Sequence, residues 1–199
     1  MSKIGLLIPT QVEWNAMHEY IKTDSQLEWN MCGMGKVNSA IGASSLINIG
    51  CDTIILFGYA GGLRGLDPGA VIEPSEYIEG DFHAEPIGIE YPNSMLSKHS
   101  TGLFRRVPIV SQDRFLNDDI YERTILAPIL ATDMEAYSVA KVCEVSGVKF
   151  YCVRIISDSC NSEASGQFLA PSLYLKDKLL AVLRDTIKRL RFYEQEAVT

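Results

Sequence analysis

Apolar runs alternate along the chain with segments of helical periodicity. The runs at residues 3–9, 54–57 and 148–159 are apolar almost throughout, which is typical of strands covered on both faces of a sheet. Residues 11–21 have helical spacing, and a helix from about Met134 carries an apolar stripe every three or four residues. Such alternation predicts an α/β fold with a largely parallel sheet.

The other segments complete this pattern. Residues 27–50 are interpreted as a strand, a glycine turn and a helix that ends at Gly50, and residues 58–65 as a glycine-rich loop after a strand. Residues 69–82 and 104–115 carry the β-branched residues of further strands, and a last helix is expected from about Phe168 to Phe192. Residues 81–106 are the least regular. We find no repeat or linker, and therefore expect one domain over residues 1–199.

Composition narrows the classes of partner. Hydrophobic residues make up 47% of the 199-residue chain and charged residues 22%, the balance of a globular protein. The net charge of −7 opposes binding to nucleic acid. No apolar run is long enough to span a membrane, and the N-terminal run is too short for a signal peptide. The five cysteines form no C-x-x-C pair, so we expect no metal, no cofactor and a reduced, cytoplasmic protein.

Three acidic residues follow predicted strands. Glu13 comes after the first strand, Glu135 after a short strand at 127–131, and Asp158 at the end of the strand that begins near residue 148. Ligands of such sheets bind beyond the carboxyl ends of the strands. Three carboxylates at one sheet edge therefore indicate a site with acid–base chemistry.

Two of these acids also fit a structural role. Thr10 stands three residues before Glu13, and Thr132 three residues before Glu135, each just ahead of a predicted helix. This spacing is that of a capping box, in which threonine and glutamate satisfy the first backbone N–H groups of a helix. From spacing alone the two glutamates are helix caps, site residues, or both.

Arg154 interrupts an otherwise apolar strand. A buried guanidinium needs a carboxylate partner, and Glu135 is the natural one, either in a site or in a structural ion pair. The segment with Gly33, Gly35 and Lys36 matches neither the phosphate-binding nor the dinucleotide-binding glycine pattern, so it is interpreted as a tight turn.

Six segments, in this order, resemble the purine nucleoside phosphorylase superfamily and, within it, most strongly the methylthioadenosine/S-adenosylhomocysteine nucleosidases. They are "IGLLIPTQVEW", "CGMGKVNSAI", "ILFGYAGGL", "IVSQDRFLND", "ATDMEAYSVAKVC" and "VRIISDS". The resemblance implies an α/β fold around a mixed, partly barrel-like sheet flanked by helices, and a homodimer. It also implies cleavage of the N-glycosidic bond of a purine nucleoside.

The resemblance implies a role for each acid. Glu13 would activate water, Glu135 would bind ribose hydroxyls beside the Met134 backbone, and Asp158 would hydrogen-bond the purine and assist its departure. Arg154 would orient Glu135. These residue types suit the reaction, because an oxocarbenium-like ribose is stabilised by a carboxylate and the leaving purine needs a proton donor.

The remaining implied contacts are to the base and the sugar. Phe115 would stack on the base, and Ser157, Tyr59, Ala60 and Gly61 would line the substrate site. Tyr59 stands where the family has Ser or Thr. Phosphorolysis, futalosine hydrolysis and nucleoside binding without catalysis remain alternatives, although a water-activating Glu13 favours hydrolysis.

Overall fold

The computed structural model describes residues 3–82, 85–88, 93–117 and 129–196. In this part of the chain eight strands form one mixed sheet. They are β1 (Ile4–Ile8), β2 (Leu27–Met31), β3 (Thr53–Gly62), β4 (Val71–Glu79), β5 (Asn93–Leu96), β6 (Arg105–Ser111), β7 (Ala131–Asp133) and β8 (Lys149–Asp158). The mixed α/β architecture is the one expected from the sequence.

Five of the strands close into a ring. β3 pairs with β8 in parallel, β8 with β4 antiparallel, β4 with β6 and β6 with β7 in parallel, and β7 returns antiparallel to β3. β1 and β2 extend the sheet from β3, and β5 extends it from β4. The ring confirms the partly barrel-like sheet, and it brings the ends of β3, β7 and β8 together.

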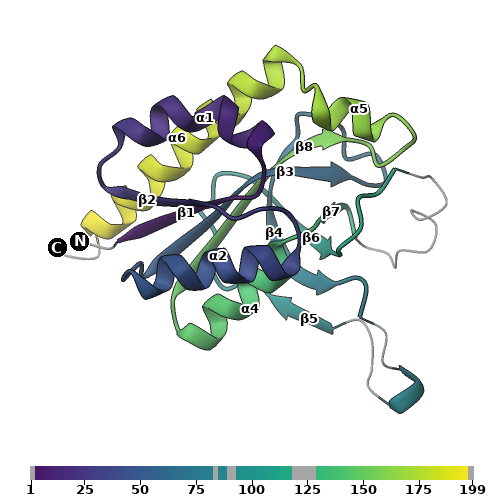
Figure 1. The fold of residues 1–199 in the computed structure, drawn as a ribbon, viewed down its shortest axis with the longest axis horizontal. Coiled ribbons are helices and arrows are strands. Elements are labelled where there is room, and N and C mark those ends of the chain that lie inside the picture. Colours follow the sequence, from purple (N-terminus) through teal and green to yellow (C-terminus); the bar gives the residue numbers. More distant parts are fainter. Residues whose placement is uncertain (1–2, 83–84, 89–92, 118–128, 197–199) are drawn as a thin grey trace.

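Two helical layers cover this sheet (Figure 1). Helices α1 (Gln11–Thr23) and α6 (Leu173–Glu196) pack on one face, and α2 (Lys36–Asn48) and α4 (Ala136–Ser146) on the other. Each layer buries its own apolar cluster against β1, β3 and β8. Strands covered on both faces explain the uninterrupted apolar runs of the sequence.

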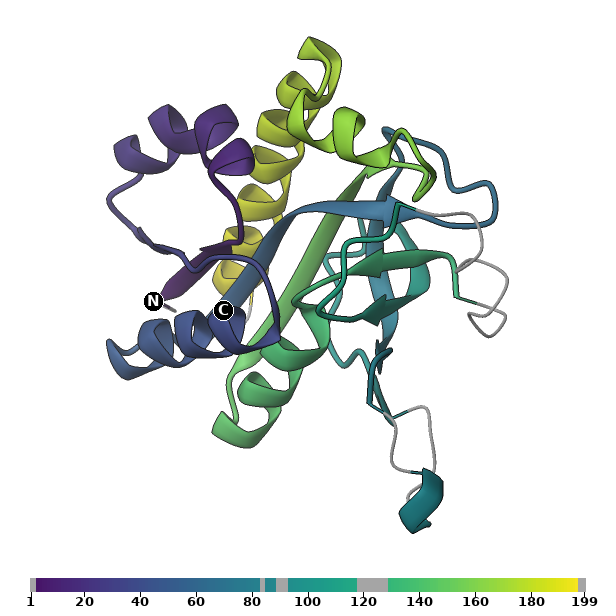
Figure 2. The same ribbon diagram turned by 45° about the vertical axis from the view of Figure 1, so that its right-hand side comes forward.

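Two short helices complete the fold. α5 (Ala164–Leu169) follows β8, and the 3-10 helix η1 (Glu85–Ile87) lies away from the body of the molecule in both ribbon views (Figures 1 and 2). No helix within the described ranges is long and apolar enough to cross a membrane.

Two predicted elements differ from the structure. The expected single helix from Phe168 to Phe192 is split into α5 and α6, because Pro171 cannot donate the backbone hydrogen bond that a continuous helix needs. The expected glycine-rich loop at 58–65 is largely strand, since β3 continues to Gly62. Glycine occurs within a strand where a neighbouring group comes too close to leave room for a side chain.

Candidate active site

A cleft that is partly open to solvent lies at the ends of β3, β7 and β8. The three predicted acids Glu13, Glu135 and Asp158 all line it. So do most of the other predicted site residues, which are Tyr59, Ala60, Gly61, Phe115, Met134 and Ser157. Arg154 is fully buried behind the wall of the cleft. The structure therefore brings together residues from across the sequence.

Glu13 is buried in the first turn of α1, with 1% of its surface exposed. Its Oε2 accepts hydrogen bonds from the Thr10 N–H at 2.9 Å and the Thr10 hydroxyl at 2.6 Å, and its Oε1 accepts one from the Tyr59 N–H at 2.7 Å. The Thr10 hydroxyl in turn caps the Glu13 N–H. The predicted capping box is thus present, and it holds a carboxylate in the cleft.

Gly58 makes room for this carboxylate. A Cβ at this position would lie 2.1 Å from Glu13 Oε1, far inside van der Waals contact. Gly58 pairs with Arg154 across the β3–β8 ladder, and the guanidinium Nη1 of Arg154 approaches the same point to 3.2 Å. Nη1 has no hydrogen-bond partner among the described residues. One buried N–H group of the guanidinium, without a partner among the described residues, therefore lies near Glu13, behind the wall of the cleft.

Arg154 holds two carboxylates. Its Nη2 donates to Glu135 Oε2 at 3.0 Å, and its Nε donates to Asp133 Oδ2 at 3.1 Å. The second oxygen of Glu135 accepts the Gly35 N–H at 3.1 Å. Burial raises the pKa of the Glu135 carboxyl, and the Arg154 charge opposes this. The expected partnership of Arg154 with Glu135 is confirmed, and Asp133 is an additional partner.

The second predicted capping box does not form. Thr132 lies in β7, and Glu135 makes no capping bond with its side chain. Asp133 caps α4 instead by accepting the Ala136 N–H, at 3.0 Å to Oδ2. The helix begins at Ala136, so the threonine is too early in the chain to be its cap. This leaves Glu135 free of a capping role.

Asp158 ends β8 with 2% of its surface exposed. Oδ2 accepts the Ser157 hydroxyl at 2.6 Å, and Oδ1 accepts the Cys160 N–H at 3.0 Å. Burial raises the pKa of Asp158 above its ordinary value of 3.8, although these hydrogen bonds act against the shift. A buried carboxyl of raised pKa can carry and donate a proton.

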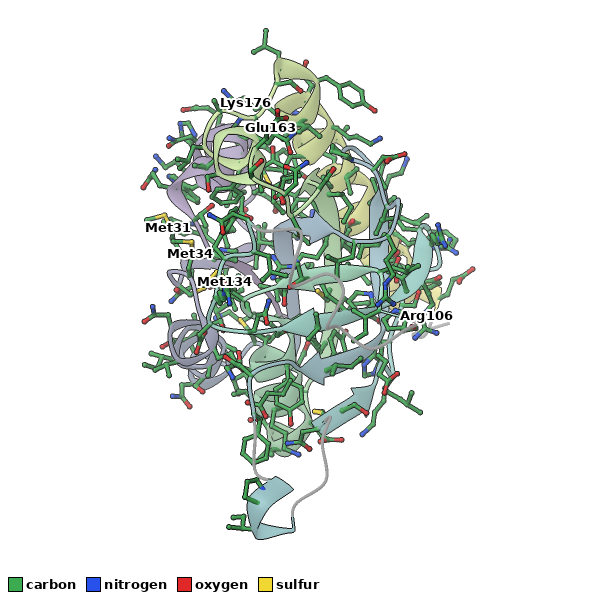
Figure 3. All side chains as sticks on the ribbon, turned by 90° about the vertical axis from the view of Figure 1, so that its right-hand side faces the viewer. Met31, Met34, Arg106, Met134, Glu163 and Lys176 are labelled. Atoms are coloured by element: carbon green, nitrogen blue, oxygen red, sulfur yellow. The ribbon has the colours of Figure 1, made fainter. Side chains whose placement is uncertain are left out.

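The walls of the cleft are aromatic and apolar. Phe115 and Phe168 contact each other with ring centroids 5.7 Å apart, and Tyr59 meets Phe168 edge-on at 6.3 Å. The Tyr59 hydroxyl is buried without a hydrogen-bond partner among the described residues. Met34 and Met134 also line the cleft, and both are labelled on the same side of the molecule in Figure 3. Flat rings and flexible thioethers suit a planar, apolar ligand group.

Several lining residues were not predicted from the sequence. They are Thr10, Met34, Asp133, Arg114, Leu116, Cys160 and Phe168, among others. The one available signal concerned Asp133, because it stands two residues before Glu135 and a buried arginine can hold two carboxylates. Phe168 comes from α5, and nothing local to its sequence marks it as part of a site.

The charge of the cleft favours a neutral or cationic ligand. Four carboxylates line it, from Glu13, Asp133, Glu135 and Asp158, whereas Arg114 is the one cationic side chain among the described lining residues. Arg154 lies behind the wall and is engaged by two of these carboxylates. An anion such as phosphate would be repelled at short range in this surrounding.

The chain matches a family model described as "Phosphorylase superfamily" over residues 24–180. It is 32% identical over 160 residues to a 5'-methylthioadenosine/S-adenosylhomocysteine nucleosidase of Exiguobacterium sp. strain AT1b, covering 68% of this chain and 69% of that protein. Many solved structures share its fold, and two serve as examples. The nucleosidase of Neisseria meningitidis in complex with methylthio-immucillin-A superposes with a TM-score of 0.83 at 20% identity, covering 94% of this chain and 99% of that one. The futalosine hydrolase of Helicobacter pylori superposes with a TM-score of 0.81 at 20% identity, covering 94% and 97%.

Proposed function

Because this chain belongs to the phosphorylase superfamily, we propose that it hydrolyses the N-glycosidic bond of a purine nucleoside similar to methylthioadenosine or adenosylhomocysteine. The observation that carries this proposal is the meeting of three buried carboxylates, Glu13, Glu135 and Asp158, in one cleft with aromatic walls. Each has different hydrogen-bond partners, so the three can take different parts in one reaction.

Asp158 is the proton donor to the leaving base. A purine leaves readily only when its imidazole nitrogen is protonated or strongly hydrogen-bonded. The raised pKa of Asp158 lets the buried carboxyl hold a proton, and the Ser157 hydroxyl and Cys160 N–H fix its orientation. We expect Phe115, next to Phe168 on the cleft wall, to pack against the base.

Glu135 binds the ribose hydroxyls and faces the positive charge that develops on the sugar. Arg154 and the Gly35 N–H hold its two oxygens from behind, so the carboxylate is fixed before the substrate enters. A preorganised negative charge stabilises an oxocarbenium-like transition state without reorganising at the moment of reaction. Met134, the neighbour of Glu135, lines the same side of the cleft.

Glu13 is the general base for the attacking water. Burial raises the pKa of its carboxyl, which makes it a better proton acceptor, while Thr10 and Tyr59 hold it in place. Arg154 Nη1, unpartnered among the described residues and close to this carboxylate, is a donor that can orient the water. The backbone of Tyr59, Ala60 and Gly61 completes this side of the site.

A homodimer fits the surface next to the cleft. Val37 and Ile41 on α2 are 69% and 60% exposed, and Met31, Met34 and Trp29 on or after β2 add further exposed apolar surface. Exposed apolar side chains gathered on neighbouring elements support a protein–protein interface here. The five cysteines are all free, which supports a reducing, cytoplasmic location.

Turnover of a nucleoside panel tests the function. The purified protein is incubated with methylthioadenosine, adenosylhomocysteine, adenosine, inosine and futalosine, each with and without phosphate. We expect free base and free sugar from a methylthioadenosine-like substrate, at a rate that phosphate does not increase. Formation of ribose 1-phosphate in proportion to phosphate would replace the hydrolase with a phosphorylase. Binding without cleavage of any member would leave a nucleoside-binding protein.

Futalosine belongs in the panel because the Helicobacter pylori futalosine hydrolase shares the fold at almost the same TM-score as the nucleosidase. The acid and base assigned to Asp158 and Glu13 would serve the cleavage of either nucleoside. The relative rates on futalosine and methylthioadenosine decide between the two substrates.

A further inference from the structure

A closed ring of hydrogen bonds lies beside the cleft and takes no direct part in the chemistry above. The Lys36 N–H donates to Asp113 Oδ1 at 2.8 Å, and the Asp113 N–H donates to Asp81 Oδ2 at 2.8 Å. The Lys36 ammonium then closes the ring by donating to Asp81 Oδ1, and it also bonds Glu79 at 3.0 Å. Lys36 therefore takes part in the ring through both its ammonium and its backbone N–H.

The ring joins three segments that are far apart in the sequence. Lys36 is the first residue of α2, Asp81 follows the end of β4, and Asp113 follows the end of β6. α2 has no side-chain cap from its own N-cap residue, Gly35, so Asp113 supplies a carboxylate to the helix from 77 residues away. A negative charge at a helix N-terminus is favourable.

On two sides, the ring of hydrogen bonds is next to residues that line or hold the cleft. On one side, the Gly35 N–H, adjacent to Lys36, holds Glu135 Oε1. On the other, Asp113 stands two residues before Phe115, which packs against Phe168 on the wall. Gly35 has a φ of +94°, and a Cβ there would lie 3.0 Å from Asp113 Oδ1, so the turn and the carboxylate are closely fitted.

The ring contains a charge-assisted contact. Its central contact joins opposite charges, with 18% of the Lys36 side chain and 33% of the Asp81 side chain exposed. Partial burial alone would raise the pKa of Asp81, but the hydrogen bonds from Lys36 and the Asp113 N–H lower it overall. Both partners therefore stay charged at neutral pH. Charge-assisted hydrogen bonds of this kind are stronger than neutral ones.

We propose that Lys36, Asp81 and Asp113 are positioning residues, which fix the segment carrying Phe115 to the turn that holds Glu135 and so set the width of the cleft for its substrate. The inference rests on the proposed function, because it assigns the two sides of the cleft to base and ribose. None of the three residues lines the described cleft, so each acts through a neighbour.

Kinetics of three variants test this role. Asp113→Ala removes the acceptor of the Lys36 N–H, Asp113→Asn keeps an oxygen there, and Lys36→Met removes the ammonium. We expect Asp113→Ala and Lys36→Met to raise KM about tenfold with a smaller effect on kcat, because the loss falls on substrate positioning. Asp113→Asn should recover most of the KM, since its amide oxygen still accepts. Lys98→Met, which removes a surface ion pair with Glu144, is the control and should match the wild type.

Hydrogen exchange gives a readout that does not depend on turnover. In the ligand-free protein, backbone exchange over residues 111–117 and 33–37 should rise together in Lys36→Met and in Asp81→Asn, although the two substitutions are in different segments. Lys98→Met should leave both stretches unchanged.

The two measurements test the ring of hydrogen bonds and the proposed function independently. Unchanged exchange in both stretches, or a KM within twofold of the wild type for Asp113→Ala and Lys36→Met, would overturn the positioning role of the ring. A protein that cleaves no nucleoside would refute the proposed function, while joint loosening of the two stretches would still support the ring.

Discussion

At the scale of single residues, the site depends on burial that changes the behaviour of ordinary carboxyl groups. Glu13, Glu135 and Asp158 are each less than 5% exposed, and burial raises the pKa of all three. They differ in what opposes the shift: Arg154 acts first on Glu13 and Glu135, and neutral hydrogen-bond donors act on Asp158. A carboxyl whose raised pKa is opposed by neutral donors rather than by a guanidinium suits a proton donor.

Replacing Asp158 by Asn tests the proton donor. An amide keeps the shape of the side chain but cannot transfer a proton to the base, so we expect turnover to fall by about two to four orders of magnitude. The rate of base release on the best substrate, at saturating concentration, is the measurement. A circular dichroism spectrum like that of the wild type shows that the fold is kept. Near-normal turnover would remove Asp158 from the mechanism.

The same substitution has a pH-dependent effect on stability. Because the folded-state pKa of Asp158 is raised, its carboxyl stabilises the fold fully only below its ordinary value of 3.8 and loses this contribution as pH rises through the folded pKa. The amide that replaces it does not titrate. The free energy of unfolding of Asp158→Asn should therefore improve relative to the wild type as pH rises from 3.8 through the raised folded-state pKa of Asp158.

Glu144→Gln should show the opposite pH dependence of the free energy of unfolding. Hydrogen bonds from Lys98 and Lys141 lower the pKa of the exposed Glu144 below 4.5, so this variant should lose stability relative to the wild type as pH rises from the lowered folded-state pKa to 4.5, with no further change above it. Urea unfolding at a series of pH values measures both variants. A difference between Asp158→Asn and wild type that stays flat with pH would contradict the raised pKa.

At the scale of elements, the position of Glu13 depends on the helix cap Thr10 and on the room that Gly58 leaves in β3. Thr10→Ala should cost about 1 kcal/mol of unfolding free energy as a lost cap, and should also lower activity because Glu13 loses a hydroxyl donor. Thr10→Ser keeps the hydroxyl and should behave like the wild type. Thr132→Ala should cost no helix cap, because Asp133 caps α4. Thermal unfolding and turnover of the three variants check this.

Gly58→Ala tests the close approach in β3. The added methyl would meet Glu13 Oε1 at 2.1 Å, so the carboxylate or the strand must move. We expect a loss of activity of about a hundredfold or more, because a displacement of about 1 Å at a catalytic group has an effect of that order. Gly166→Ala in α5 has open space around the new methyl and is the matched control. Equal activity of the two variants would show that Gly58 is not required.

At the scale of the whole molecule, the exposed apolar face next to the cleft should pair two copies. Ile41→Glu puts a charge on this face and should convert the dimer to a monomer, because burying an unpaired carboxylate is costly. Leu173→Glu changes an exposed leucine at the start of α6 and should leave the dimer intact. Analytical ultracentrifugation distinguishes the two. A wild-type chain that sediments as a monomer would rule out this interface.

Local signals of the sequence determined most of the architecture and the candidate acids. Apolar runs mark buried strands and periodic stripes mark helices, since each depends on neighbours a few residues away. The same signals predicted that Glu13, Glu135 and Asp158 lie at or after strand ends, and that Thr10 caps α1. The expected continuous helix from Phe168 to Phe192 was wrong, although its break at Pro171 has a local cause, the lost backbone donor of that residue.

Tertiary structure decided what joins these parts. The sequence could not show that Asp133, rather than Thr132, caps α4, or that Gly35 holds a carboxylate 100 residues away. Nor could it show that the glycines after Phe57 continue a strand, because the need for glycine at position 58 comes from the Glu13 carboxylate on another element. These contacts depend on how the closed ring of strands brings distant backbone together, and no window of neighbouring residues contains that information.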